Sequence, residues 1–171
     1  MLLINRFIKL IENHAETLSA KWVDAVRKSP LTAGYAKLSK AELHDIVYGR
    51  FRKLGEWVEK KDGLDRQIAE HFLQVGAERA ETGIKVSEMA YSLMLERDLI
   101  WRYILEEGII TEGIDLNRAI EFSHRLNHFY EKAVYFALVG HENHGVPAPR
   151  TQEEGFFEST FEGFRHWLMV E

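Results

Sequence analysis

Apolar side chains recur at helical spacing along nearly the whole chain, and this periodicity constrains the fold more than any other feature. The first segment shows it clearly, because its apolar residues share one face while Lys9, Glu12, Glu16 and Asp24 lie mostly away from it. These apolar residues are Ile4, Phe7, Ile8, Ile11, Ala15, Leu18, Trp22 and Val26. No segment alternates apolar and polar residues as a half-buried strand does. The pattern predicts an all-α protein.

Residues that start or stop helices mark the expected boundaries. Proline disfavours helical backbone in the preceding residue, so Ser29-Pro30 ends the first helix, and a loop through Gly34 follows. Ser39 and Glu42 form a capping box, and Gly83 suits a helix C-cap. The second expected helix starts at Ser39 and ends before the turn Lys61-Asp62-Gly63. The other four run from Ile4 to Ser29, Leu64 to Gly83, Ser87 to Gly108 and Asp115 to Gly140, with Ser87 and Asp115 as N-caps. Short connections predict an antiparallel helical bundle of five long helices plus a C-terminal helix, or a globin-like variant.

The composition changes after Gly140. We expect a helical sensory or regulatory domain over residues 1–140, a turn-rich linker over 141–150 and an amphipathic aromatic helix over 151–171. Thr151 and Glu154 form a second capping box at the start of that helix. Its expected interaction residues are Phe156, Phe157, Phe161, Phe164 and Trp167.

This density of aromatic side chains exceeds what a short solvated helix would expose. We therefore expect the C-terminal helix to cover apolar surface within a homodimer. The alternatives are packing on its own bundle as a sixth helix, exchange between protomers, or docking onto another protein.

Composition excludes several functional classes. The chain has 171 residues, no cysteine and a formal net charge of −5. An acidic chain lacks the basic face of a general nucleic-acid-binding protein, and no segment reaches the roughly 20 apolar residues that span a bilayer. The apolar start, Met1 to Ile4, is too short for a signal peptide. We expect a cytoplasmic protein that binds neither nucleic acid nor membrane.

Histidine spacing supplies the main alternative function. His124 and His128 stand four residues apart on the fifth expected helix, a spacing that helical metal sites use. A metal needs three or four ligands, so His44 or His71 would have to join the pair. A metal-dependent helical-bundle protein is this alternative, and a partly exposed histidine pair without metal is the simpler interpretation. His71 is also the best-placed haem ligand, but no motif supports haem, and we expect no cofactor.

Charged residues interrupt the apolar fourth helix. Asp98 and Arg102 are spaced for an i,i+4 ion pair, and Glu96 and Arg79 suit a solvated or interhelical ion-pair network. Asp98 would need a partner group in a cleft to act as an acid or base. Nucleophile elbows and phosphate-binding glycine loops are missing from the sequence, so we expect no enzyme.

Four helix-packing motifs together carry a family resemblance. They are Trp22-x-x-x-Val26 before Ser29-Pro30, Leu38-Ser39-x-x-Glu42-Leu43, Ala77-Glu78-Arg79-x-x-x-Gly83-Ile84, and Glu96-Arg97-Asp98-Leu99-Ile100-Trp101. Through them, residues from about Leu10 to Glu106 resemble the RsbT co-antagonist N-terminal domain (RsbR/RsbD type) of bacterial stress regulators and sensor kinases. One departure is Glu96, which separates a leucine and an arginine that are usually adjacent.

The resemblance implies a dimeric sensory or protein-interaction module in signal transduction, with no catalysis of its own. A kinase or an anti-sigma system is the implied regulatory partner. A small-ligand sensor with an apolar pocket between helices is compatible with this function.

Overall fold

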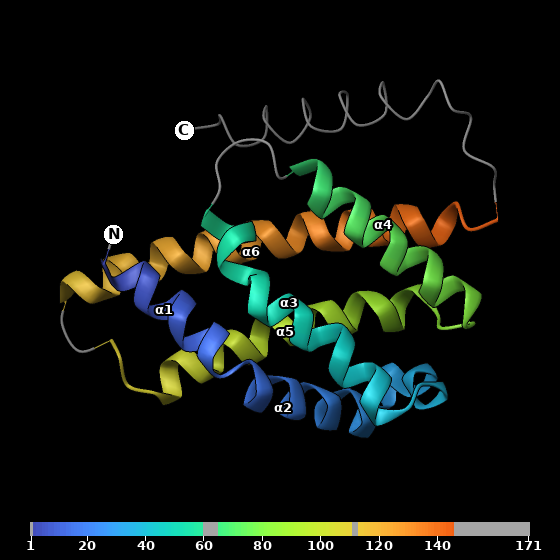
Figure 1. Cartoon of the computed structure of the whole chain (residues 1–171), viewed down its shortest axis with the longest axis horizontal. Coiled ribbons are helices and arrows are strands. Elements are labelled where there is room, and N and C mark those ends of the chain that lie inside the picture. Colours follow the sequence, from blue (N-terminus) through green and yellow to red (C-terminus); the bar gives the residue numbers. More distant parts are fainter. Residues whose placement is uncertain (1, 60–64, 111–112, 146–171) are drawn as a thin grey trace.

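The computed structural model describes residues 2–59, 65–110 and 113–145 (Figure 1). The elements are α1 (Leu2–Asn13), α2 (Ala15–Lys28), the 3₁₀ helix η1 (Pro30–Lys37), α3 (Lys40–Glu59), α4 (Asp65–Glu81), α5 (Val86–Glu106) and α6 (Gly113–Glu142). No strand occurs within these described ranges. The prediction of an all-α helical bundle is confirmed.

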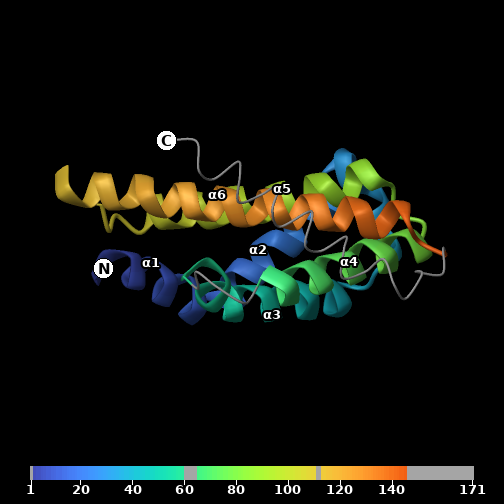
Figure 2. The ribbon, with the colours of Figure 1, turned by 90° about the horizontal axis from the view of Figure 1, so that it is seen from above.

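The helices form two layers (Figures 1 and 2). α5 and α6 lie side by side and antiparallel in one layer, and α1, α2, α3 and α4 make up the other. α3 and α4 run obliquely to the long α6 rather than along it (Figure 1). Between the layers lies a single apolar core, whose largest fully buried side chains include Trp22, Tyr35, Phe7, Phe51, Phe72, Phe122 and Phe136.

The first expected helix is broken into two. His14 separates α1 from α2 with non-helical dihedral angles (φ −106°, ψ 19°), and its Nδ1 lies 2.7 Å from the hydroxyl of Tyr103 on α5. The apolar stripe continues through the break, since Ile11, Ala15 and Leu18 are all buried. The bend is invisible in the periodicity for that reason, and the prediction of one continuous helix is wrong.

The expected loop through Gly34 is instead the helix η1. Ser29 caps it by accepting a hydrogen bond from the Leu31 amide (3.2 Å), and Thr32 donates to the Val26 carbonyl (2.6 Å). Proline at the first position fits a helix start, because its missing N–H would be unpaired there. η1 then places the Tyr35 ring in the core.

Three predicted helix ends are confirmed. Ser39 and Glu42 form the capping box, with the Ser39 amide 2.8 Å from Oε2 of Glu42 and the Glu42 amide 3.2 Å from the Ser39 hydroxyl. Gly83 (φ +68°) and Gly108 (φ +63°) follow α4 and α5 in the left-handed conformation that favours glycine.

Two predicted N-caps are wrong. α5 starts at Val86 after Lys85, and the Lys85 amide donates to Glu88 (3.1 Å), so Ser87 lies inside the first turn. α6 starts at Gly113, which places Asp115 in its first turn, where an acidic side chain still complements the helix dipole.

Two glycines let α4 and α6 pack backbone against backbone. A Cβ atom on Gly76 would collide with the carbonyl oxygen of Ala137, and one on Gly140 with that of Leu73. Among the described elements, this pair of helices makes the most extensive contact. Gly140, expected to end the fifth helix, is therefore a packing residue, and α6 continues to Glu142.

The second capping box, at Thr151 and Glu154, and the aromatic residues from Phe156 to Trp167 lie outside the described residues.

Candidate functional site

The outer face of the α5–α6 layer exposes large apolar side chains. Leu105, Leu116 and Ile120 are 51%, 53% and 58% exposed, and Met94 and Tyr135 are also exposed. With half-buried neighbours they form a surface that we call the α5–α6 seam. The seam comprises Met94, Trp101 and Leu105 on α5 and Leu116, Ile120, Val134, Tyr135 and Leu138 on α6.

Two shallow hollows along the seam fix the register of its helices. One of about 280 Å³ brings Trp101 together with Ser123 and Asn127. Because the helices are antiparallel, Leu105, one turn after Trp101, lies level with Ile120, about one turn before Ser123. The apolar residues at this end of the seam therefore lie together.

The second hollow, of about 260 Å³, lies nearer the end of α6. It is lined by Met94, Arg97, Tyr130, Glu131, Val134, Tyr135 and Leu138. Its walls are mainly apolar, and Arg97 and Glu131 bring charge to it. Such a surface suits contact with another protein, which buries apolar side chains inside a polar rim.

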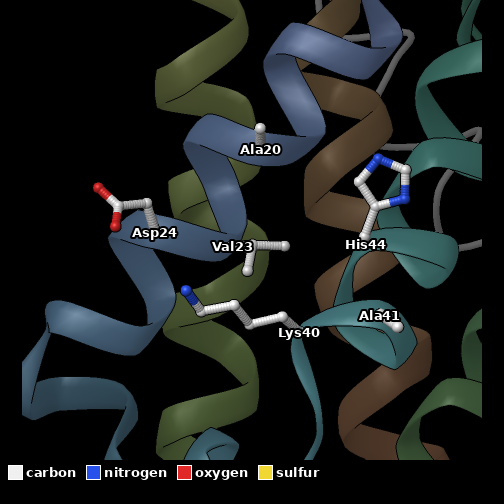
Figure 3. A pocket seen from close by; sticks show the side chains of 6 residues that line it. All are labelled: Ala20, Val23, Asp24, Lys40, Ala41 and His44. Carbon is white, nitrogen blue, oxygen red and sulfur yellow. The ribbon is translucent and has the colours of Figure 1, made fainter.

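A groove of about 410 Å³ lies on the other layer, between α2 and the start of α3 (Figure 3). It is lined by Ala20, Val23, Asp24, Lys40, Ala41 and His44. Lys40 extends across it toward the side of Asp24 (Figure 3). Asp24 pairs with Lys28 (2.6 Å) and His44 with Glu16 (3.1 Å), so the groove offers mainly the small apolar groups of Ala20, Val23 and Ala41.

An ion pair lies in the interior, where α3, α5 and α6 meet. The guanidinium of Arg50 on α3 donates to both carboxylate oxygens of Glu96 on α5. The Tyr130 hydroxyl on α6 also donates to Glu96, at 3.3 Å. Arg50 and Glu96 are only 4% and 0% exposed, so solvent does not screen the pair. The sequence-based expectation of an interhelical ion pair holds for Glu96.

Burial controls the protonation of these groups. Burial raises the pKa of Glu96, and Arg50 opposes that rise by favouring the carboxylate. Burial and the neighbouring Glu96 carboxylate raise the pKa of Tyr130 well above its ordinary value, so its hydroxyl remains a donor. Arg50 therefore stabilises the charged form of a carboxyl group that burial alone disfavours, and Tyr130 is a neutral donor to it.

A second polar group joins α4, α5 and η1. The guanidinium of Arg79 on α4 lies 5.7 Å from the centre of the Tyr35 ring, and the Tyr35 hydroxyl lies 2.7 Å from the hydroxyl of Ser92. The Ser92 carbonyl accepts a hydrogen bond from the indole of Trp22 (3.0 Å). Arg79 is 3% exposed, so its charge is also buried.

The four candidate metal ligands lie in different surroundings. His124 is exposed, and His128 is half-buried with Glu131 3.6 Å away. His44 pairs with Glu16 at the edge of the groove, and His71 packs against the Trp57 ring (5.1 Å). Across residues 2–59, 65–110 and 113–145, no group of three or more histidine, aspartate or glutamate side chains is arranged to hold a metal. The metal hypothesis gains no support.

His71, the candidate haem ligand, belongs to a cluster of rings. The rings of Trp57 and Phe72 pack against His71, and Phe129 packs against both of those rings, with ring centres 4.9 to 6.1 Å apart in the contacting pairs. Burial and the nearby charge of Arg50 lower the pKa of His71 to about 4, so the imidazole is neutral at pH 7. These rings fill the space beside His71.

The expected Asp98–Arg102 ion pair is wrong. The Asp98 carboxylate forms its ion pair with Arg97 (3.1 Å), and Arg102 donates to the backbone carbonyl of Asp98 (3.4 Å). The sequence reasoning also missed Arg50 and Tyr130 as partners of Glu96. Arg50 is buried on the same face of α3 as Val47, Phe51 and Leu54. An arginine within this apolar stripe was the sequence feature that could have indicated a buried ion pair.

Comparison with known proteins identifies one family. The family model described as the RsbT co-antagonist protein rsbRD N-terminal domain matches residues 16–143, which include every element from η1 to α6 and all of α2 except Ala15. No curated protein and no solved structure matches the chain. No helix in the part of the chain that the structure describes is both long and apolar enough to cross a membrane.

Proposed function

Because this chain belongs to the RsbT co-antagonist N-terminal domain family, we propose that it is a non-catalytic regulatory module of bacterial stress signalling. It acts through protein–protein contacts rather than through a reaction. Its proposed partner is a regulatory protein, either a kinase or an anti-sigma system.

The observation that supports this function is the α5–α6 seam. Large apolar side chains that gather on one exposed face of a soluble protein mark candidate interaction sites. Leu105, Leu116 and Ile120 are each more than half exposed and lie at one end of the seam. We assign the seam to self-association, since two copies related by a twofold axis would each cover the other's apolar face.

The α2–α3 groove would stay open in such a dimer, because it lies in the other layer (Figure 2). Its small apolar lining beside Lys40, Asp24 and His44 suits a partner segment that is apolar with a polar edge. The proposed homodimer therefore leaves a surface for the regulatory partner.

The first test replaces Ile120 by glutamate. A charge in the middle of an apolar dimer interface would be desolvated without a partner, so Ile120→Glu is expected to halve the mass measured by light scattering. Leu31→Glu on η1 is the matched control, because Leu31 is equally exposed (57%) but lies outside the seam. The control is expected to keep the dimer and to melt within about 2 °C of the wild type, whereas Ile120→Glu should melt at a lower temperature because it loses the stabilisation that dimerisation adds. A wild-type monomer, or an Ile120→Glu dimer, would contradict the assignment.

The second test concerns the C-terminal aromatic residues Phe156, Phe157, Phe161, Phe164 and Trp167. We propose that this segment adds apolar contacts within the dimer, since burying one such side chain is worth about 1.5–3 kcal/mol. Truncation after Gly145 is expected to weaken dimerisation and to lower the melting temperature. Light scattering and thermal unfolding measure the two effects. Unchanged mass and unchanged melting temperature would assign the segment to another protein, and loss of stability alone would indicate a sixth helix on its own bundle.

A further inference from the structure

The hollow of the seam that lies nearer the end of α6, which we call the α6-end hollow, presents apolar side chains to solvent. Met94 and Tyr135 are 42% and 40% exposed, and Val134 and Leu138 are half-buried in the same hollow. Its volume of about 260 Å³ is below the range of about 300–1,000 Å³ that is usual for small-molecule pockets. The α6-end hollow therefore suits a few apolar side chains of a protein segment better than a separate small ligand.

The α6-end hollow lies far from the end of the seam that we assign to self-association. Ile120 and Leu138 are 18 residues apart on α6, which corresponds to about 27 Å along the helix axis. A second copy centred on Leu116 and Ile120 would have to extend over that length to cover the hollow as well. This end of the seam therefore has room for a separate occupant.

The chain leaves α6 at a fixed point close to the hollow. α6 ends at Glu142, and its last turn is held against the connection between α4 and α5, with Nε2 of His141 2.8 Å from the carbonyl oxygen of Ile84. Gly145 has a φ of +79°, a left-handed conformation that is typical of tight turns. The chain therefore changes direction just after α6.

The C-terminal segment, residues 151–171, starts within reach of the α6-end hollow. Leu138 lies four residues before Glu142, or about 6 Å along the helix axis. Residues 146–150 span at most about 18 Å when extended, which is enough to return to Leu138. A segment tethered this closely has a millimolar effective concentration at the hollow, so weak intrinsic affinity suffices to keep it bound.

The sequence of the C-terminal segment complements the hollow. Phe157, Phe161, Phe164 and Leu168 are spaced i, i+4, i+7 and i+11, so they would share one face of a helix. Glu158 and Glu162 would lie on another face, as a helix packed on a protein surface requires. The segment therefore offers a row of large apolar groups to a hollow that exposes apolar groups of its own.

We propose that the C-terminal segment binds the α6-end hollow, with its phenylalanine side chains packed against Met94 and Tyr135. This inference rests on the contact of the segment within the dimer proposed above, and it names the surface that the segment contacts. The hollow of the same bundle and that of the second copy both satisfy it. Bound there, the segment covers the end of the seam that the second copy leaves exposed, so the seam offers one self-association surface rather than two.

The test is crosslinking in the full chain, whose lack of cysteine makes introduced thiols unique. Glu131→Cys places a thiol at the edge of the α6-end hollow, and Thr160→Cys places one in the segment. A short bismaleimide is expected to join this pair at least about tenfold faster than it joins Thr160→Cys to Ala20→Cys in the α2–α3 groove, after correction for the labelling rate of each single cysteine. Equal rates, or a faster reaction at Ala20→Cys, would overturn the proposal.

The mass of the crosslinked product shows which hollow is used. A product with the mass of one chain assigns the segment to its own bundle, and a product with the mass of two chains assigns it to the second copy. A wild-type monomer that still gives the fast crosslink would remove the proposed dimer but keep this inference. A dimer without the fast crosslink would keep the dimer and remove this inference.

Substitutions within the segment show whether its apolar face makes the contact. Phe161→Ser/Phe164→Ser is expected to slow the crosslink between Glu131→Cys and Thr160→Cys to the rate seen with Ala20→Cys. Glu162→Ser, on the other face of the segment, is the control and should keep the fast rate. A rate that does not change in the double phenylalanine variant would overturn the proposal.

Discussion

Gly76→Ala and Gly140→Ala are each expected to destabilise the protein by about 3 kcal/mol, at the upper end of the cost of overpacking a core. The added methyl group would meet a backbone carbonyl in each case, that of Ala137 for Gly76 and that of Leu73 for Gly140. A side chain could move aside, whereas a helix backbone can yield only if α4 and α6 separate. Urea unfolding followed by far-UV circular dichroism measures the loss as a lower midpoint with unchanged slope.

Gly49→Ala is the matched control for these two substitutions. Gly49 also lies within a helix, α3, but a Cβ atom there would have no heavy atom within 4 Å. Alanine is favoured over glycine in a helix interior, so this variant is expected to gain about 0.5–1 kcal/mol. If all three variants shift the midpoint in the same direction and by similar amounts, the close approach of α4 and α6 is not what limits stability.

The glycines also show why sequence reasoning recovers the helices better than their packing. Periodicity and the capping box at Ser39 and Glu42 are local, so they could be predicted from neighbouring residues alone. Gly140 looked like a helix end because glycine favours helix ends. Its actual role depends on Leu73, 67 positions earlier in the chain. No local pattern contains that contact.

The prediction of one continuous helix through His14 was wrong for a related reason. The apolar stripe stays in phase across the break, and the Tyr103 hydroxyl that meets His14 comes from α5. Likewise, the segment expected to be a loop forms the helix η1. Its Tyr35 side chain packs in the core, where the Tyr35 hydroxyl forms a hydrogen bond with the Ser92 hydroxyl. Tertiary contacts override local preference at both positions.

The candidate site was predicted only in part. Glu96 stood out as a charge within an apolar helix, and the interhelical ion pair was among the interpretations considered. Its partner could not be identified, since Arg50, Arg79, Arg97 and Arg102 were all available in the sequence. The α5–α6 seam was not predicted either. In the sequence, Leu105 and Ile120 are apolar residues like those of the core, and only the orientation of α5 and α6 shows that they are exposed.

Breaking the buried ion pair is the second large effect that we expect. Glu96→Gln leaves the Arg50 guanidinium buried without its carboxylate, and removal of one partner of such a pair costs about 3–5 kcal/mol. Arg50→Met should be comparably destabilising at pH 7. The double variant Arg50→Met/Glu96→Leu removes both charges, so it is expected to be more stable than either single variant. A double variant whose loss equals the sum of the single losses would contradict coupling between Arg50 and Glu96.

The pH dependence of Arg50→Met provides an independent check of the pair. Burial already raises the pKa of Glu96, and Arg50 is the main group that opposes the rise. Without Arg50 the folded protein holds a proton on Glu96 at a higher pH than the unfolded chain does. Stability in Arg50→Met should therefore increase as the pH falls from about 7 to about 5. The double variant lacks the carboxyl group and should not show this increase, because only the protonation of Glu96 relieves the unpaired buried charge.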